Sequence, residues 1–509
     1  MSRAWGRPAF RLGVVGGVAL ALAGGAYAYV CHPDLRGTLR LPVGGRVDGY
    51  SMHGQRVTID IWADGCERQV VWNPLVRSST RGGCTDGVPS ESDTRRSAQN
   101  GRFRVVLRDG SAALDQPDRL AVFDTRTGAA VHAWPLPARA STVDLARGVA
   151  VLSTSNGVYA VRLRDGQNAL VGVKRRGDFP QIEPPGIVFQ DDLYKRPGGR
   201  ALLKFIPFAT VSTALRPSGP LHVPTTIGDF AMDGRSAIFV KRDPSGQCDH
   251  IGLWNIPWHY STDLMDEPPI CPEKHAPGGI TALAIGGQYV EVVTTYGKER
   301  TLISSTIVRC IEKVVTRSRL GRGAVRALAA DGPMMTYGTG GRIGFLSGQR
   351  VTGKADSSAI PVQLSADGRS LAVLRSDGRV DIRSAAGLLG TFPAAGVRAI
   401  ALRADKLVML RRGSLDVYDV SSGLRLHRWR VPAGTAPAVD VHFGVAVLAA
   451  GRNIVAVRLE TGRTAVLFRS PTPARAHLDD VGVVYRYNVG RSGVLGFIPF
   501  AAVERRLGA

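Results

Sequence analysis

The chain has 509 residues, of which 44% are hydrophobic and 21% are charged, and it contains 61 Gly and 30 Pro. This balance is typical of a turn-rich globular protein and excludes a disordered chain, and the length exceeds what one compact core usually holds. Lys and Arg outnumber Asp and Glu by 65 to 42, and the net charge of +23 favours contact with anionic surfaces. The basic residues are dispersed, so the charge also fits a basic composition with no acidic partner.

The N-terminus has the pattern of an export segment. Arg3, Arg7 and Arg11 precede an uncharged stretch at residues 12–30, LGVVGGVALALAGGAYAYV. As a helix this stretch would span roughly 28 Å, enough to cross a bilayer core, with the basic flank in the cytoplasm and the bulk outside. Ala26-Tyr27-Ala28 could also be cut by signal peptidase. The sequence therefore predicts a single-pass membrane protein or, after cleavage, a secreted or periplasmic one.

The cysteines agree with an oxidising compartment. Of six cysteines, Cys66 and Cys84 form one locally spaced pair and Cys248 and Cys271 form another. Exported proteins keep such pairs as disulfides, each contributing about 2 to 4 kcal/mol. The spacing suggests these two pairs, although connectivity does not follow from sequence alone.

An internal duplication decides the fold class. Residues 120–134, LAVFDTRTGAAVHAW, match residues 415–429, LDVYDVSSGLRLHRW, at an offset of 295. Two further segments repeat in the same order, with residues 148–166 matching 444–462 and residues 205–211 matching 497–503.

A shorter period lies inside the long one. Segments beginning at Asn100, Met232 and Ala366 each place an Asn-Gly or Asp-Gly turn before an apolar strand. A later strand ends in Asp-x-x-Thr/Ser-Gly, where the Asp side chain can cap the turn and Gly can take the left-handed conformation. Four short strands per unit, repeating at roughly 40 residues, are typical of a propeller blade.

Counting these units gives about four between Arg40 and Arg216 and about seven from Leu221 onward. The sequence thus predicts an all-β fold, a β-propeller of about seven four-stranded blades, with about four blade-like units before it and an N-terminal hydrophobic helix. The expected domains are residues 1–33, 34–218 and 219–509. The first group of units could form a small propeller or a partial ring, or both groups could share one larger ring.

The segments FDTRTGAAVHAW and YDVSSGLRLHRW resemble the quinoprotein-like (PQQ-like) propeller repeat, and the DGRS segments resemble WD-repeat-like and lactonase-like blades. This resemblance implies an architecture rather than a function. Quinoprotein dehydrogenases hold their quinone beneath a Cys-Cys disulfide beside calcium, and this chain has no Cys-Cys. Trp134 and Trp429 are therefore interpreted as blade-packing residues, and the repeated His132 and His427 before them as structural.

Residues 248–275, CDHIGLWNIPWHYSTDLMDEPPICPEKH, are the most unusual local feature. A Cys248–Cys271 disulfide is the favoured interpretation, and the alternative is a zinc site of Cys248, His250, Cys271 and His275. The same stretch offers three aromatic candidates for binding a partner, Trp254, Trp258 and Tyr260. They could equally be residues of an outer blade strand.

No catalytic motif is recognisable in the sequence: there is no GxSxG elbow, and residues 338–344, GTGGRIG, are typical of a hairpin turn. We therefore expect a binding or scaffolding module outside the cytoplasm, with a protein partner or an anionic membrane or envelope component. The alternative is a propeller enzyme, either a quinoprotein-like dehydrogenase or a metal-dependent lactonase or lyase. No cofactor is predicted, while calcium, zinc and quinone stay open; nucleic acid rests on charge alone and conflicts with export.

Overall fold

The computed structural model describes residues 35–508 with internal gaps. The gaps are residues 36, 64–65, 86–95, 112–115, 155–156, 173–178, 192–200, 217–218, 234–235, 243–248, 257–259, 264–277, 287–288, 297–298, 309–310, 322–324, 332–333, 340–341, 348–349, 357–360, 367–369, 385–386 and 433. The expected N-terminal helix lies outside the described residues. Within the described ranges, no helix combines the length and apolarity needed to cross a bilayer.

The described strands form eleven four-stranded antiparallel sheets, nearly all of them built from strands that are consecutive in sequence. Each sheet is one blade. In nine of them the chain passes from an inner strand outward through three hairpins, and in the other two the outer strand comes from an earlier part of the chain. The expected all-β propeller fold with four-stranded blades is confirmed by this strand order.

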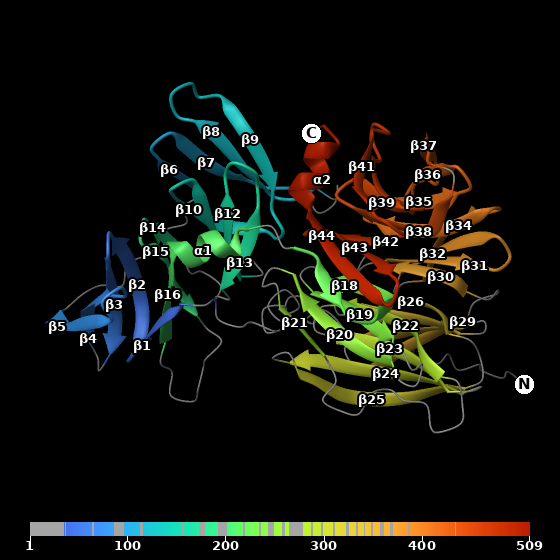
Figure 1. Cartoon of the computed structure of the whole chain (residues 1–509), viewed down its shortest axis with the longest axis horizontal. Coiled ribbons are helices and arrows are strands. Elements are labelled where there is room, and N and C mark those ends of the chain that lie inside the picture. The colour runs from blue at the N-terminus through green and yellow to red at the C-terminus, as the bar shows by residue number, and fades with distance from the viewer. Residues whose placement is uncertain are drawn as a thin grey trace, which may run out of the picture.

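Four blades form an N-terminal unit, which we call the arc (blue to green in Figure 1). Its first blade contains β2 (Arg46–His53), β3 (Arg56–Ala63), β4 (Cys66–Asn73) and β5 (Ser78–Thr85). The second contains β6 (Ser97–Asn100), β7 (Phe103–Arg108), β8 (Arg119–Asp124) and β9 (Ala130–Pro135). The third contains β10 (Ala140–Ala146), β11 (Val149–Thr154), β12 (Gly157–Arg162) and β13 (Asn168–Gly172). The fourth contains β14 (Gln181–Glu183), β15 (Gly186–Asp191), β16 (Ala201–Pro207) and, as its outer strand, β1 (Leu39–Val43).

Seven blades form the C-terminal unit, which we call the ring (green to red in Figure 1). Ring blade one contains β18 (Thr226–Asp233), β19 (Ser236–Arg242), β20 (Asp249–Asn255) and β21 (Tyr260–Asp263). Blade two contains β22 (Gly278–Gly286), β23 (Tyr289–Tyr296), β24 (Glu299–Val308) and β25 (Ile311–Gly321). Blade three contains β26 (Val325–Asp331), β27 (Met334–Thr339), β28 (Arg342–Ser347) and β29 (Arg350–Asp356). Blade four contains β30 (Pro361–Ala366), β31 (Ser370–Arg375), β32 (Arg379–Ser384) and β33 (Gly387–Pro393). Blade five contains β34 (Val397–Arg403), β35 (Lys406–Arg411), β36 (Ser414–Asp419) and β37 (Arg425–Arg430). Blade six contains β38 (Thr435–His442), β39 (Val445–Ala450), β40 (Asn453–Arg458) and β41 (Thr464–Arg469). Blade seven contains β42 (Arg475–Asp479), β43 (Gly482–Val489), β44 (Ser492–Pro499) and, as its outer strand, β17 (Leu221–Val223).

The ring closes on itself. Its seven inner strands neighbour one another in sequence order, and the first of them, β18, lies beside the last, β42. The strand before the first ring blade, β17, pairs with β44 and completes the last blade, which joins the two ends of the ring by hydrogen bonds. The arc repeats this device, since β1 pairs with β16.

Each unit ends in a seven-residue helix, α1 (Phe208–Ala214) after β16 and α2 (Phe500–Arg506) after β44. The duplicated FIPFATV and FIPFAAV segments span the end of the preceding strand and the start of these helices.

The hydrophobic core is divided among the spaces between neighbouring blades. Blades two and three of the arc enclose one cluster that includes Val105, Leu120 and Leu152, and ring blades five and six enclose another around Leu415 and Leu448. Both faces of a blade between two neighbours are therefore covered. This explains why β11 and β39 are buried at every position.

The arc remains open at blades one and two. Its inner strands neighbour one another in the order β6, β10, β14 and β2, and Figure 1 shows blades one and two at opposite ends of this series. The buried residues of β7 alternate with Arg104 and Arg108, which are exposed. In β3 the buried Val57, Ile59 and Ile61 alternate with residues that solvent reaches. One face of each end blade is thus built to meet water.

The arc and the ring meet through α2. Glu504 of α2 is buried, and its carboxylate accepts two hydrogen bonds from Arg119 of β8, at 2.7 and 3.2 Å. Ala501 of α2 belongs to the core cluster between arc blades two and three, together with Trp134. The last helix of the ring therefore covers part of the core of the arc.

Candidate functional site

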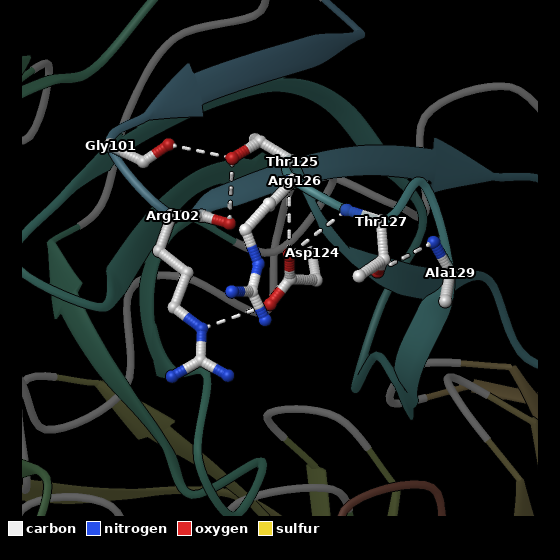
Figure 2. A network of polar contacts seen from close by, with 7 residues as sticks. All are labelled: Gly101, Arg102, Asp124, Thr125, Arg126, Thr127 and Ala129. Carbon is white, nitrogen blue, oxygen red and sulfur yellow. Dashed lines mark hydrogen bonds and ion pairs between the residues drawn. The ribbon is translucent and has the colours of Figure 1, made fainter.

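The repeated Asp-x-x-Thr/Ser-Gly segment forms the capped turn that the sequence predicts. Figure 2 shows the arc copy, where the Asp124 carboxylate accepts the backbone N–H of Arg126 at 3.0 Å and of Thr127 at 3.3 Å. Gly128 closes the turn with φ of 70°. Hydrogen bonds from Arg102 to Asp124 and from Thr125 to the carbonyls of Gly101 and Arg102 tie this turn to the neighbouring hairpin.

The ring copy of this turn is built in the same way. The Asp419 carboxylate accepts the hydroxyl of Ser421 and the backbone N–H and hydroxyl of Ser422, and these hydrogen bonds lower the pKa of Asp419. Gly423 has φ of 71°. These Asp residues are occupied in holding turns, and a catalytic role would require them to release those bonds.

The repeated tryptophans join each blade to the next. Trp134 Nε1 donates to the Leu163 carbonyl and Trp429 Nε1 donates to the Leu459 carbonyl, both at 2.8 Å. His132 stacks on Trp134 and His427 stacks on Trp429, with ring centroids 4.7 and 5.1 Å apart. The structural interpretation of these residues agrees with this geometry.

Two further histidines lie on inner strands of the ring, in different electrostatic surroundings. His442 is buried, and burial and the nearby Arg403 hold its pKa well below the ordinary value. His477 is partly buried, which disfavours its protonated form, but the charge of Asp440 and a 2.7 Å hydrogen bond to it prevail and raise its pKa. Asp440 also accepts the backbone N–H of Leu478 at 3.2 Å, so this pair fastens β38 to β42.

The sequence-predicted sites are only partly described. A disulfide joins Cys66 of β4 to Cys84 of β5, as their spacing suggests. Cys248, Cys271, His275 and Trp258 lie outside the described residues, and the side chain of Tyr260 is not described. His250 lies on β20 and is half-buried. The Cys248–Cys271 disulfide and the zinc alternative both stay predictions.

Trp254 does not belong to an exposed binding surface. It lies on β20, the third strand of its blade, and is only 2% exposed. Its indole packs in the cluster between ring blades one and seven, with Phe230 and Leu495. The expectation of an exposed aromatic patch does not apply to this residue, because a neighbouring blade covers the strand.

Exposed apolar side chains lie instead on or next to the outer strands of ring blades four, five and six. We call this set the leucine edge: Leu388, Leu389, Leu424, Leu426 and Val466, which are 42 to 66% exposed. Exposed arginines flank it on β37, at positions 425, 428 and 430. An apolar set bordered by charges is typical of a protein-binding surface.

Two of these residues are the extra residues of β-bulges. Between β32 and β33 the partner of Ile382 is Gly390 and the partner of Arg383 is Leu388, which leaves Leu389 as the extra residue. A bulge at the same place in blade five leaves Leu426 extra. A bulge redirects a side chain, and both of these are exposed, whereas Leu467, the extra residue of the matching bulge in blade six, is 1% exposed. Sequence reasoning missed the leucine edge, because a bulge is invisible until the strand pairing is known.

Comparisons with solved structures give WD40 propellers. The chain is similar to the WD40 propeller domain of Doa1 (11% identity, 56% of this chain, 96% of that chain, TM-score 0.42). It is similar to the WD40 domain of Toxoplasma gondii coronin (10%, 56%, 87%, 0.39) and to that of Neurospora crassa Pan2 (11%, 54%, 90%, 0.40). These identities concern the fold alone, and the propeller assignment rests on the strand order above. No family model and no curated protein matches the chain.

Proposed function

We propose that this chain is an extracytoplasmic, membrane-tethered propeller that acts as a binding and scaffolding module, with a protein partner held at the leucine edge. The observation that carries the proposal is the pair of bulges that present Leu389 and Leu426 to solvent, 57 and 42% exposed. Isolated exposed leucines are ordinary on a protein surface, whereas several on the outer strands of three successive blades favour contact with another protein.

The location rests on different residues. Residues 1–30 have the export pattern, and the Cys66–Cys84 disulfide suits an oxidising compartment. Both features support a position outside the cytoplasm.

The partner is tested with the full chain purified from detergent-solubilised membranes of its own cells. We expect a protein that co-purifies stoichiometrically with the natural sequence and is lost from a Leu389→Asp, Leu426→Asp variant. Val131→Asp is the matched control, because Val131 is the bulge residue of arc blade two and is 43% exposed. The control is expected to retain the partner.

Two results would overturn the binding module. One is an identical set of co-purifying proteins from all three chains. The other is stoichiometric calcium or zinc in the purified protein together with turnover of a small molecule, which would identify the propeller enzyme instead. Location is tested separately: an impermeant protease added to intact spheroplasts should digest the ring, and complete protection would contradict the proposed orientation.

A further inference from the structure

One face of the arc gathers the turns of all four blades. Asn100 Nδ2 of β6 donates to the Leu145 carbonyl of β10 at 3.1 Å, so the carboxyl ends of these inner strands lie side by side. The backbone N–H of Ile182 in β14 donates to Asp144 of β10, and Gln181 accepts the backbone N–H of Met52 at the end of β2. The turns that follow the inner strands therefore emerge on one face of the arc.

The turns between third and fourth strands emerge on the same face. Asp124, the last residue of β8, pairs with Phe103 at the first turn of its blade. Arg162, the last residue of β12, pairs with Val149 in the same way. Each blade thus presents two turns to this face, which we call the turn face.

Exposed arginines occupy the turns of the duplicated blades: Arg102 and Arg126 in blade two, Arg147 and Arg164 in blade three. The side chains of Arg102 and Arg164 are 73 and 75% exposed. Figure 2 shows Arg102 and Arg126 extending beside the Asp124 carboxylate. In blade one, Arg56 and Arg77 are exposed at the corresponding turns.

The ring supplies an internal control for these charges. In its duplicated blades five and six, the positions equivalent to the four arginines are Asp405, Ser421, Phe443 and Glu460. Arc blade two and ring blade five keep the same geometry in the turn between their third and fourth strands. In both, an Asp side chain caps the turn and a Gly with positive φ closes it. The ring turns therefore fold without arginine at these positions. In the arc, Arg102 pairs with Asp124 at 2.9 Å and Arg164 lies 3.6 Å from Asp165, while both arginine side chains stay largely exposed.

The chain also enters the arc at this face. Leu35 packs against the cluster that contains Phe208 of α1, and Arg147 lies over the Phe208 ring at 5.6 Å. The first strand, β1, starts at Leu39, opposite Phe205 at the end of β16. In the sequence, four residues separate the apolar stretch of residues 12–30 from Leu35. Leu75 and Val76, 46 and 66% exposed, lie in the turn between β4 and β5 on the same face.

We infer that the turn face of the arc lies on a membrane surface that contains anionic lipids, with Arg102, Arg126, Arg147 and Arg164 at the headgroups and Leu75 and Val76 at the interface. Basic side chains beside an anionic bilayer each add to the attraction, and apolar tips add burial. This inference rests on the proposed membrane tether, which brings the face within reach of the bilayer.

The experiment measures amide hydrogen exchange of the full chain in vesicles of phosphatidylcholine alone and in vesicles with about 30% phosphatidylglycerol. We expect exchange at residues 101–102, 126–128, 147–148 and 164–166 to slow by about ten-fold or more in the anionic vesicles, and added salt to reverse this. Turns of the ring at residues 404–405 and 421–423 should exchange equally in both.

Three variants sharpen the result. Arg102→Asp, Arg126→Ser and Arg164→Glu together install the residues of the ring and should abolish the protection. The same three positions changed to Lys keep the charge and should keep it. Arg412→Glu with Arg452→Glu lowers the net charge in exposed turns of the ring and should leave the protection unchanged.

The outcomes separate this inference from the tether. If the protein floats with both kinds of vesicle but the turns of the arc exchange at the same rate in both, the inference is overturned and the membrane tether is supported. Flotation with anionic vesicles alone, with the same turns protected, would support the inference and refute the tether. Protection by soluble polyglutamate but by neither vesicle would assign the face to a different anion and overturn the inference.

Discussion

The arc and the ring contain the same duplicated blades, but the ring closes on itself and the arc stays open between its blades one and two. In the ring, every blade has neighbours on both sides, and central strands such as β39 are buried at all six positions. In the arc, blades one and two have one neighbour each, and β7 alternates between buried and accessible residues. Closure therefore follows from which strand faces are apolar, because a polar face cannot be buried against another blade without unpaired groups.

The two copies also differ in their buried polar residues, while the tryptophan contact between neighbouring blades is the same. Asp416 of the ring is fully buried and binds Arg411 and Arg428, whereas the equivalent arc residue is Ala121. The contact of a tryptophan with the turn of the next blade is the same in both. A buried ion-pair cluster is thus present in one copy alone, while the tryptophan contact between blades is present in both.

The largest expected effect concerns the glycines beneath the two tryptophans. A Cβ on Gly166 would lie 2.6 Å from Trp134 Cε3, a Cβ on Gly462 would overlap Trp429, and both glycines have φ near +70°. We expect Gly166→Ala and Gly462→Ala each to lower the free energy of unfolding by about 3 kcal/mol, measured by urea denaturation.

The matched controls are Gly128→Ala and Gly423→Ala, which have the same positive φ but no atom within 4 Å of the added Cβ. These should cost only the backbone strain, about 1 kcal/mol. Equal losses at Gly166 and Gly128 would show that the tryptophan contact does not distinguish these sites.

The next effect concerns the joint between the units. Arg119→Ser leaves the buried Glu504 carboxylate without its two hydrogen bonds, and we expect a loss of about 2 to 3 kcal/mol together with separation of arc and ring in small-angle scattering. The duplicated positions are Ser414 and Ser212, so a Ser pair is compatible with both blade and helix. Arg119→Ser with Glu504→Ser should therefore cost less than Arg119→Ser alone, and a larger loss in the double variant would contradict the charge argument.

The periodic features were accessible from sequence because they are local. Single strands, Asp-capped turns and the positions of the tryptophans each depend on fewer than about 20 neighbouring residues, and the blade repeat is a succession of such local patterns. The burial of Trp254 was not accessible, because it depends on a blade that is far away in the chain. The turn face was not accessible for the same reason, since the turns that contain Arg102 and Arg164 lie on one face only once their blades are packed together. The alternation in residues 57–62 does mark an arc end, but only once the position of the blade is known.

A smaller expected effect is the pH dependence of stability, which should differ between the ring and the arc. His442 and His477 of the ring correspond to Ala146 and Gln181 of the arc. The lowered pKa of His442 means that the unfolded chain takes up its proton first, so ring stability should fall as pH drops below about 6.5. The raised pKa of His477 acts in the opposite direction, with stability present below about 6.5 and lost as pH rises through its folded-state value.

We expect His442→Ala to remove the acid-side loss, worth about 1 kcal/mol, and His477→Gln to remove the loss at higher pH. Urea titrations from pH 5 to 8 measure both. Identical pH profiles for the natural chain and both variants would mean that neither histidine changes its protonation on folding.

The smallest effect compares the tryptophans themselves. Trp134 is 8% exposed and shares its cluster with Ala501 of α2, whereas Trp429 is only partly buried. Trp134→Phe leaves the Leu163 carbonyl without its donor in a buried place, and we expect a loss of about 1 kcal/mol. Water can reach the Leu459 carbonyl after Trp429→Phe, so the loss there should be smaller. A larger loss in the ring than in the arc would show that α2 does not shield the arc tryptophan in solution, and that the joint seen between the units is weaker than its contacts indicate.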